Sequence, residues 1–345
     1  MMEIQIVDPS SVPDWDGLLL RSDDHDFFHT SAWARVLQKA YAFKPIYHVG
    51  IEDGKIAFLM PMMEIKSYLS GRRGVSLPFT DQCPPFYRDQ DSLKGVLDDI
   101  MRCGERSRWR YIEWRDGQYF EDSVLAWDTF YVHEVDLLKT EQDLFSSLSD
   151  SNRRNIRKSQ KEGVCITVSQ SLDSVREFYR LNLITRKRHG LPPQPFTFFR
   201  HIFEHIISKG NGHVVLASYE DQTVAAAMFF HFGKKAIYKF GASNMQIQHV
   251  RPNNLVMWEA LKWYHDRGFH TMNLGRSELS NPGLRRYKRT WGGREAQIKY
   301  FRYDLGKRVF LHKDADRMAD VGKIFMKIPM PILRILGFLF YRHAG

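Results

Sequence analysis

The chain has 345 residues, of which 43% are hydrophobic and 14% aromatic, and its 50 Lys and Arg against 40 Asp and Glu give a formal net charge of +10. This much apolar material requires a buried core, which excludes a largely disordered chain and favours one large domain or two medium ones. The positive charge favours an anionic partner, either nucleic acid, a nucleotide-linked substrate or anionic lipid, although a merely basic enzyme would also satisfy it.

Cysteine and histidine usage argues against a disulfide framework and against a metal enzyme. The three cysteines, Cys83, Cys103 and Cys165, are far apart and odd in number, which is typical of a reducing compartment. The fourteen histidines include no H-E-x-x-H motif, so we expect no dedicated metal site. The first fifteen residues carry acidic and polar side chains where a signal peptide would need an apolar run. We therefore expect a cytoplasmic protein.

The first half of the chain predicts an alternation of helices and strands. Thr30 or Ser31 can cap a helix, and Asp53-Gly54 is a two-residue turn between two apolar runs. The predicted elements are, in order, a helix over 31–41, a hairpin over 45–66, a short strand and a Pro-rich loop over 73–86, a helix over 92–107 and a buried strand over 109–116.

The second half repeats this order. Its predicted elements are helices over 151–162, 171–188 and 196–209, a hairpin over 213–232, a strand over 234–243, a helix over 254–268 and a buried strand over 269–275. Superposing IEDGKIA on YEDQTVA aligns Glu52 with Glu220, and superposing RWRYIEW on GFHTMNL aligns Arg108 with Gly268. The common order suggests a duplicated α/β (α+β) unit, a mixed sheet flanked by helices, although the few identities are also compatible with chance.

Two groups of basic residues lie in the second half. The helix over 151–162 carries five basic residues around its circumference and few balancing acids, so a phosphate-facing helix and a merely solvated one are equally favoured; they are Arg153, Arg154, Arg157, Lys158 and Lys161. Arg186, Arg188 and His189 end the next helix, where complementing the helix dipole explains them sufficiently. A substrate role is the less favoured alternative.

The segment 273–293, NLGRSELSNPGLRRYKRTWGG, shows neither helical nor strand periodicity. We expect an irregular loop that follows the carboxyl end of a strand, where α/β sheets commonly bind ligands. The guanidinium groups of Arg276, Arg285 and Arg286 suit bidentate phosphate contacts. Tyr287 and Trp291 would anchor the loop in the core.

The loop before the helix over 254–268 lacks the features of a pyrophosphate cradle. SNMQIQHVRPNN contains no glycine, and Pro252 removes a backbone amide donor. We therefore do not expect a coenzyme A site of the usual kind.

Several motifs occur together in an order that resembles the Fem-type (FemA/FemB-like) aminoacyl/acyltransferases of the GNAT superfamily. They are RRNIRKSQKEGV, PNNLVMWEALKW with the following RGF, NLGRS, YKRTWGG and, in the first half, SLPFTDQCPP. The resemblance implies two tandem GNAT-like lobes, over 1–148 and 149–310, and transfer of an acyl or aminoacyl group onto an amine of a peptidoglycan or exopolysaccharide precursor. The acceptor would be nucleotide- or lipid-linked. The donor would be a co-substrate, aminoacyl-tRNA or an acyl thioester such as acyl-CoA, with no bound cofactor.

The same resemblance suggests site residues. Lys288 occupies the Y-K-x-x-W-G position of the family's catalytic lysine and would stabilise the oxyanion. Glu278 is a weaker candidate for accepting the amine proton, and substrate-assisted proton loss is equally favoured. Asn273 stands where relatives often have an acid, and the long helical arm of the staphylococcal members is missing. The candidate substrate-binding residues are Arg276, Arg285, Arg286, Tyr238, Asn254, Trp33, Asp81, Arg153, Arg157 and Arg188.

The C-terminal tail, over 311–345, is expected to form an amphipathic helix. Its apolar run within KIFMKIPMPILRILGFLFYRHAG is shorter than the ~20 residues needed to span a bilayer. Flanking Lys and Arg favour a helix that lies on an anionic membrane surface, and a helix packed on the body of the protein is nearly as well supported.

Two other functions remain open at this point. One is an acetyl-CoA-dependent GNAT N-acetyltransferase, and the other is a non-catalytic RNA- or nucleotide-binding module that uses the basic helix.

Overall fold

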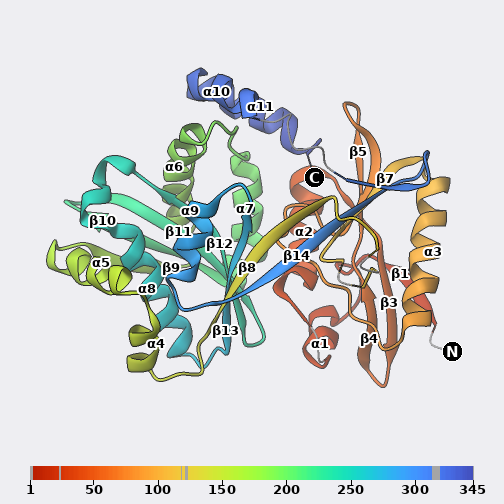
Figure 1. Ribbon diagram of the computed structural model, residues 1–345, viewed down its shortest axis with the longest axis horizontal. Coiled ribbons are helices and arrows are strands. Elements are labelled where there is room, and N and C mark those ends of the chain that lie inside the picture. Colours follow the sequence, from red (N-terminus) through yellow and green to blue (C-terminus); the bar gives the residue numbers. More distant parts are fainter. Residues whose placement is uncertain (1–2, 23–24, 118, 121–122, 313–318, 345) are drawn as a thin grey trace. The chain divides into compact units, whose positions relative to one another are not determined.

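The computed structural model describes residues 3–22, 25–117, 119–120, 123–312 and 319–344, and it divides into two compact units (Figure 1). Unit 1 consists of Met1–Phe130, Gln297–Ala315 and Leu339–Gly345, and unit 2 consists of Tyr131–Ala296 and Asp316–Phe338. The borders differ from the expected 148/149 and 310/311 because β8 (Asp128–Asp136) and β14 (Arg294–Asp304) each start in one unit and end in the other.

Unit 1 contains two sheets. Strands β1 (Ile4–Val7), β3 (Tyr47–Glu52) and β4 (Lys55–Met60) form an antiparallel sheet. The second sheet has the order β2 (Lys44–Pro45), β5 (Met63–Ser67), β6 (Gly71–Val75), β7 (Trp109–Arg115) and the end of β14, which also pairs with β15 (Val309–Leu311). Its helices are α1 (Trp15–Leu20), the short 3₁₀ helix η1 (Phe27–His29), α2 (Ser31–Tyr41) and α3 (Gln90–Arg106).

The two predicted helices and the buried strand of the first half are confirmed, whereas the predicted hairpin over 45–66 ends at Met60 and Met63–Ser67 is a strand of the other sheet. Two elements show their cause clearly. The Thr30 hydroxyl accepts a hydrogen bond from the Trp33 N–H, so it is the N-cap of α2. Asp53 and Gly54, at φ 51° and 70°, form the kind of turn that suits the twist of a two-residue hairpin.

Unit 2 is a mixed sheet in the order β9 (Cys165–Ser169), β10 (Gly212–Tyr219), β11 (Gln222–Phe232), β12 (Lys235–Ser243), β13 (Thr271–Glu278) and β8. Strands β12 and β13 are parallel, and the pairs from β9 to β12 are antiparallel. The helices are α4 (Glu141–Ser147), α5 (Asp150–Lys161), α6 (Leu172–Arg188), α7 (Phe196–His205), α8 (Pro252–His265), α9 (Pro282–Arg289), α10 (Ala319–Lys327) and α11 (Met330–Tyr341), with 3₁₀ helices η2 (Ile207–Lys209) and η3 (Met245–Val250). Helix α11 also crosses a unit border, because its residues from Leu339 on belong to unit 1.

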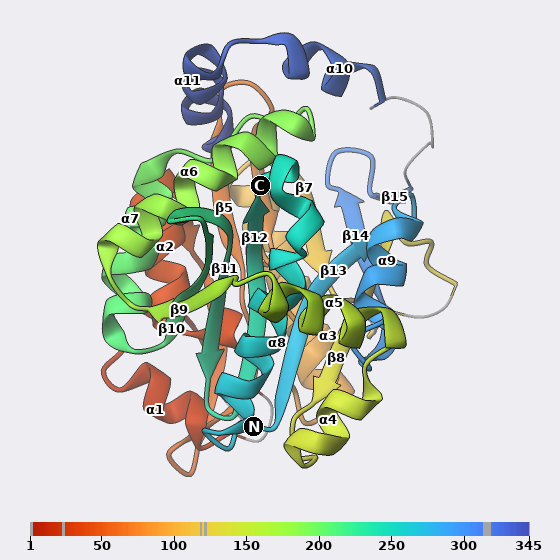
Figure 2. The same ribbon diagram turned by 90° about the vertical axis from the view of Figure 1, so that its left-hand side faces the viewer.

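Side chains of β11 alternate between two cores, which is why helices cover both faces of this sheet (Figure 2). Ala227 and Phe229 belong to the cluster that contains the buried face of α8. Phe230 instead contacts Phe240, whose ring lies 5.6 Å from Phe199 of α7. The predicted α/β class, a mixed sheet flanked by helices, is confirmed.

The two hairpins share detailed geometry. Each has a two-residue turn with both φ angles positive, Asp53-Gly54 in one and Glu220-Asp221 in the other. Each also has a register irregularity just before the turn, between Gly50 and Ile51 and between Ala217 and Ser218. The matching turns pair Asp53 with Glu220, so the structural alignment of the hairpins is shifted by one residue from the sequence alignment of Glu52 with Glu220. The turn and the bulge, and not a single identical residue, set the register of the strands.

The second alignment agrees with the structure. Arg108 and Gly268 have φ values of 55° and 64°, and each lies between the end of a helix and the start of a strand. The matching turns favour a duplication of the unit.

The C-terminal tail forms two helices, α10 and α11, rather than one. Pro329 and Pro331 lie at the break, where proline interrupts a helix. Leu333 is fully buried, and the Pro193 carbonyl leaves no room for a side chain at Gly337. The apolar residues Ile324, Ile335 and Phe338 remain 60–62% exposed. None of the helices described here, in a search limited to the unmasked residues, is long and apolar enough to cross a membrane.

Candidate functional site

The parallel pair of unit 2 positions the candidate site. Strands β12 and β13 pair only over Lys235–Ile237 and Thr271–Asn273, although both continue further. The carboxyl ends of parallel strands are where α/β sheets commonly bind ligands. Tyr238, a predicted site residue, is the first residue of β12 beyond this pairing, and desolvation raises the pKa of its hydroxyl to about 12.

The expected irregular loop over 273–293 is a wrong prediction for most of its length. Strand β13 continues to Glu278, and α9 begins at Pro282. Asn281 is the N-cap, since its side-chain oxygen accepts the Leu284 N–H, and proline suits the first helical position. Helix α9 was missed because eight residues are too few to show a period and because its basic side chains do not make an apolar stripe.

Lys288 lies on the buried side of α9, with 4% of its surface exposed. Its Nζ donates hydrogen bonds to the carbonyl oxygens of Gly275, at 2.8 Å, and Arg276, at 2.7 Å. Gly275 has a φ of 74°, a conformation that favours glycine, and its N–H donates to Asn273 Oδ1 at 2.7 Å. The side chain of Asn273 thus holds the backbone of β13 at Gly275. These contacts place a buried ammonium group directly against the carboxyl-terminal half of β13.

Two aromatic residues, Tyr287 and Trp291, lie close to Lys288 in the sequence. Trp291 is fully buried, as predicted, and its ring packs edge-on against Tyr287 with centroids 5.9 Å apart. Burial raises the pKa of the Tyr287 hydroxyl. Trp291 belongs to the core cluster of unit 2 and Tyr287 packs against it, so the position of α9 is determined by packing as well as by its charges.

Glu295 anchors the other side of α9. Arg285 donates to its carboxylate at 2.8 and 2.6 Å, and Arg289 donates at 2.9 and 2.6 Å. His133 Nε2 lies 3.0 Å from the same carboxylate. The hydrogen bonds from Arg285, followed by those from Arg289, hold the pKa of Glu295 far below its usual range, whereas burial lowers the pKa of His133.

Glu295 and His133 were not predicted from the sequence to belong to the site. One signal was available for Glu295, because it is the only acidic residue between Glu278 and Asp304 in a strongly basic stretch. His133 gave no comparable signal. Its role depends on a contact between residues 162 positions apart.

A basic pocket of about 440 Å³ lies along α9, lined by Pro282, Gly283, Arg285, Arg286 and Arg289. Arg285 is committed to Glu295 and also lies over the Tyr131 ring, 3.4 Å from its centroid. Arg286 is exposed, and its guanidinium group makes no hydrogen bond or ion pair among the described residues. Of the arginines predicted to bind phosphate, Arg286 is therefore the one that the fold leaves available.

The other candidates at the end of β13 are placed differently. Arg276 is half-buried, and its carbonyl oxygen accepts the Lys288 hydrogen bond. Glu278 is exposed at the last residue of the strand, and Ser280 Oγ lies 3.5 Å from its carboxylate. Both residues belong to the strand end that Lys288 of α9 contacts.

Asn254 has a structural role. Its amide donates to Asn152 Oδ1 at 3.0 Å, and Asn152 in turn donates to the carbonyl and hydroxyl oxygens of Thr290, the residue that ends α9. This chain of hydrogen bonds ties α8 and α5 to α9. A buried amide satisfied in this way holds the neighbouring helices in position.

Two predicted substrate-binding residues of α5 already contact neighbouring residues. Arg153 donates to the Ser146 carbonyl at 2.7 Å and pairs with Asp150. The guanidinium of Arg157 lies over the Phe145 ring, 5.5 Å from its centroid. Arg188, at the exposed end of α6, hydrogen-bonds His189 at 3.1 Å.

The remaining two candidates belong to unit 1. Trp33 is fully buried among Phe27 and Phe28, with centroid distances of 6.1 and 5.4 Å. Its assignment as a substrate ligand is not compatible with this position, because a core tryptophan offers no surface. Asp81 is half-buried, and its backbone carbonyl accepts the Tyr300 hydroxyl.

The expectation of no metal site overlooked one H-x-x-x-H pair, His201 and His205. These two histidines and Glu204 lie together on α7. The cluster is remote in sequence from the residues of the candidate site.

Comparison with known proteins gave matches over both the second half and most of the chain. Residues 146–289 match the model of the acetyltransferase (GNAT) domain family. The lipid II:glycine glycyltransferase of Staphylococcus haemolyticus is 20% identical over 45% of this chain and 53% of its own length. The chain thus corresponds to about half of that relative.

Two solved structures resemble the fold over most of its length. The crystal structure of FemX has a TM-score of 0.67 at 14% identity and covers 89% of this chain and 98% of its own. A tandem GNAT protein from the clavulanic acid biosynthesis pathway has a TM-score of 0.56 at 9% identity, covering 92% of this chain and 100% of its own. These matches confirm the predicted arrangement of two tandem GNAT-like lobes.

Proposed function

We propose that the chain is a Fem-type N-acyltransferase of the GNAT superfamily that moves an aminoacyl group onto an amine of a cell-envelope precursor. The observation that carries this proposal is the buried Lys288 ammonium at the carboxyl-terminal half of β13. The relative with a curated activity is a glycyltransferase acting on lipid II, which favours an aminoacyl donor and a lipid-linked acceptor.

In the proposed reaction the acceptor amine attacks the activated carbonyl of the donor. A C–N bond forms, and the bond from the carbonyl carbon to the leaving oxygen breaks. Lys288 stabilises the negative charge that develops on the carbonyl oxygen, because a buried cation acts through a lower dielectric than an exposed one. The amine proton passes to Glu278 or to the departing oxygen, which leaves as a hydroxyl. Arg286 binds a phosphate of the acceptor in the α9 pocket.

The donor is proposed to be an aminoacyl-tRNA that contacts α5. Arg154, Lys158 and Lys161 are exposed and have no hydrogen-bond or ion-pair partner within the residues that the structure describes. Helix α5 buries Asn152, Ile156 and Ser159 on its opposite side. Its exposed side therefore presents positive charge without neutralising acids, as a nucleic acid backbone requires.

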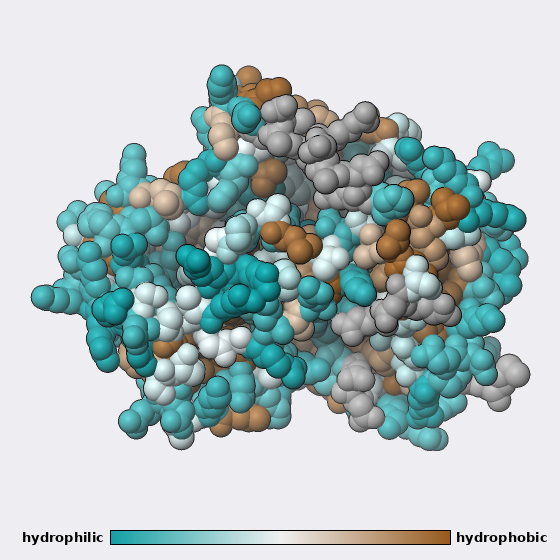
Figure 3. All heavy atoms as spheres, in the orientation of Figure 1, coloured by the Kyte–Doolittle hydropathy of each residue, from teal (hydrophilic) through white to brown (hydrophobic). Residues whose placement is uncertain are grey.

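The acceptor is proposed to be bound at an anionic membrane surface, on its cytoplasmic side, through α10 and α11. Exposed apolar residues of these helices include Ile324, Ile335 and Phe338, and hydrophobic and hydrophilic atoms lie side by side at the top of Figure 3. A pocket of about 430 Å³ between α6, α7 and α11 is lined by Tyr179, Phe196, Ile335 and Phe338, with Arg334 as its one basic side chain. Apolar lining with a single cation suits the chain and phosphate of an anionic lipid.

The function is tested by supplying purified protein with radiolabelled aminoacyl-tRNA and either lipid-linked or nucleotide-linked muropeptide. We expect label to be transferred to the acceptor, with the lipid-linked form preferred. Transfer of acetyl from acetyl-CoA instead would support the acetyltransferase alternative. Salt-sensitive tRNA binding without turnover on any acceptor would support the RNA-binding module.

Membrane attachment is tested by replacing exposed apolar residues while leaving Leu333 and Gly337 in place. The triple variant Ile324→Ser, Ile335→Ser, Phe338→Ser should lose co-sedimentation with phosphatidylglycerol vesicles. Ile184→Ser, which alters an exposed residue of α6, is the control and should bind as the wild type does. Unchanged vesicle binding by the triple variant would remove the tail from the proposal.

A further inference from the structure

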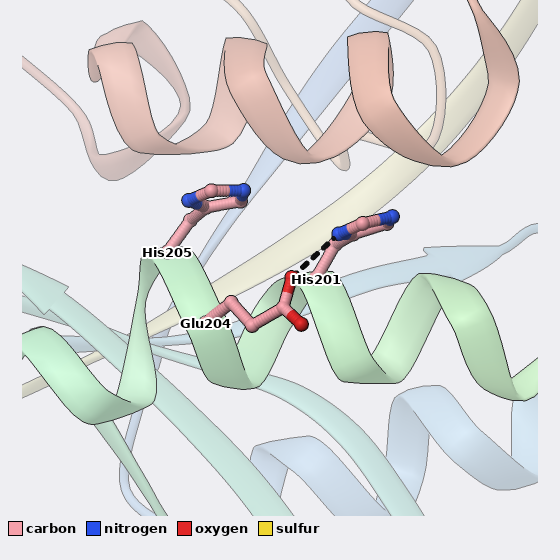
Figure 4. Close-up of side chains that lie close together, drawn as sticks. All are labelled: His201, Glu204 and His205. Atoms are coloured by element: carbon pink, nitrogen blue, oxygen red, sulfur yellow. Dashed lines mark hydrogen bonds and ion pairs between the residues drawn. The ribbon is translucent and has the colours of Figure 1, made fainter.

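Three metal-ligating side chains lie together on α7, outside the site described above. His201, Glu204 and His205 each offer one ligand atom, and these atoms all lie within 4.8 Å of one another. Figure 4 shows the three side chains emerging from neighbouring turns of α7, with the His201 imidazole directed at the Glu204 carboxylate. Among the residues that the structure describes, no other group of this kind occurs.

The local sequence explains why they meet. Positions i, i+3 and i+4 of a helix lie on one face, and HIFEH places two imidazoles and a carboxylate at these positions. Helix α7 is held in place by the buried Phe198, Phe199 and Ile202. His201 and His205 are half-buried on its flank, whereas Glu204 is exposed. The helix that carries the three metal-ligating side chains is therefore held in place before a metal ion binds.

The geometry is close to that of a chelating group. His201 Nδ1 lies 2.8 Å from Glu204 Oε2, and the two imidazole rings are nearly parallel, 13° apart, with centroids separated by 5.9 Å. The cluster occupies the last turn of α7, where the helix dipole favours a cation. Arg200 lies 3.6 Å from Glu204 as a competing but exposed cation.

We propose that His201, Glu204 and His205 bind one divalent transition-metal ion, of which Zn²⁺ is the best match. Zn²⁺ prefers imidazole nitrogen and carboxylate oxygen, and three protein ligands leave a fourth tetrahedral position for water. The H-x-x-E-H spacing also occurs in a class of zinc peptidases, and in zinc peptidase motifs of this type two histidines four residues apart bind the ion. The ion would bridge successive turns and stabilise the end of α7.

This site is independent of the proposed acyl transfer, and its test needs no substrate. Chelator-treated protein is titrated with ZnCl₂ in a calorimeter at pH 7.5. We expect saturable binding of one ion per chain, weakening as the pH falls towards 5.5 because protonated imidazole does not coordinate a metal. Zn²⁺ should also raise the melting temperature, since it binds only the folded chain.

Variants locate the ion. Loss of an outer partner of a metal ligand already costs about 10–100-fold in affinity, so His201→Asn and His205→Asn should each weaken Zn²⁺ binding at least about tenfold, and Glu204→Gln should weaken it as well. The control is His249→Asn, because His249 is exposed on η3 and pairs with no carboxylate among the described residues. Circular dichroism of each variant without metal checks that α7 is still folded.

The proposal is overturned by either of two results. One is unchanged Zn²⁺ affinity in folded His201→Asn and His205→Asn proteins. The other is a titration with no saturable step, which would indicate scattered weak binding to surface histidines.

Discussion

Helix α5 leaves Arg154, Lys158 and Lys161 exposed to solvent, whereas α9 holds two of its arginines on Glu295 and its lysine against backbone carbonyls. Both helices are short, rich in Arg and Lys, and capped by a side-chain oxygen, from Ser149 in one and Asn281 in the other. The difference comes from what lies beside them. A carboxylate and a strand end face α9. On α5, Asp150 pairs with Arg153, but within the described part of the chain no acid pairs with Arg154, Lys158 or Lys161. Basic composition therefore identifies a charged helix but not whether its charges are free.

The largest effect should follow from Lys288→Met, which removes the buried charge of α9. Losing one oxyanion-stabilising group should lower turnover roughly a hundredfold or more. The carbonyls of Gly275 and Arg276 would also lose a donor, at a cost of about 1–3 kcal/mol in unfolding free energy. Turnover is therefore measured below the melting temperature of the variant.

The matched control on α5 is Lys158→Met, which should leave turnover unchanged at saturating donor. Near wild-type turnover by the folded Lys288→Met protein would remove Lys288 from the mechanism and reduce α9 to a structural helix.

Glu295→Gln should have the next largest effect, a loss of stability, because it removes the carboxylate charge that holds Arg285 and Arg289 of α9. These ion pairs of Glu295 are called the Glu295 clamp below. The change removes charge-assisted hydrogen bonds to Arg285 and Arg289, and we expect a loss of about 1–2 kcal/mol after solvent screening, measured by urea unfolding. Glu134→Gln is the control, since Glu134 makes only a long contact with Arg294, at 3.9 Å. Equal stability of the two variants would contradict the clamp.

The same clamp predicts a pH dependence. The pKa of Glu295 is depressed in the folded state, chiefly by its hydrogen bonds from Arg285. Its stabilisation is therefore fully present above the unfolded value of about 4.3 and is lost as the pH falls below it. The difference in melting temperature between wild type and Glu295→Gln should shrink from pH 7 to pH 3. A difference that stays constant over this range would exclude an ionic clamp.

A smaller effect, confined to binding, is expected on α5. Replacing Arg154, Lys158 and Lys161 by Glu should weaken tRNA binding and reduce the slope of log affinity against log salt by about 2, from the loss of three phosphate contacts. Turnover at saturating donor should persist. The control reverses Arg176 and Arg180 on α6, which already pair with acids. An unchanged salt slope in the α5 variant would make that helix a merely solvated one.

The smallest effect is expected for free coenzyme A. Helix α8 begins after Arg251, in the left-handed conformation at φ 58°, and has Pro252 as its first residue, so it offers no glycine-rich pyrophosphate cradle. Calorimetry should show little heat at millimolar ligand. A micromolar dissociation constant, about 8 kcal/mol of binding, would favour a thioester donor and remove the reason for a tRNA-binding α5.

Short-range sequence patterns predicted most of the helices and strands. The N-cap at Thr30 and the turn at Asp53-Gly54 depend on residues within a few positions of one another, so they could be predicted from spacing alone. The unit borders could not be predicted, because β8 and β14 pair with strands distant in the chain. Helix α9 was also missed, since an eight-residue helix is stabilised by its packing more than by its own propensity.

For the candidate site, the sequence by itself determined which residue types are present and where the chain turns. The Y-K-x-x-W-G motif singled out Lys288, and Trp291 was correctly predicted to be buried. Only the tertiary structure decided which charges are free. Arg285 and Arg286 are adjacent and identical in sequence, yet one is held by Glu295 and the other lines the α9 pocket. Such a choice depends on the partner that the fold brings within hydrogen-bonding distance, and Trp33 was misassigned for the same reason: burial is a property of the packed chain.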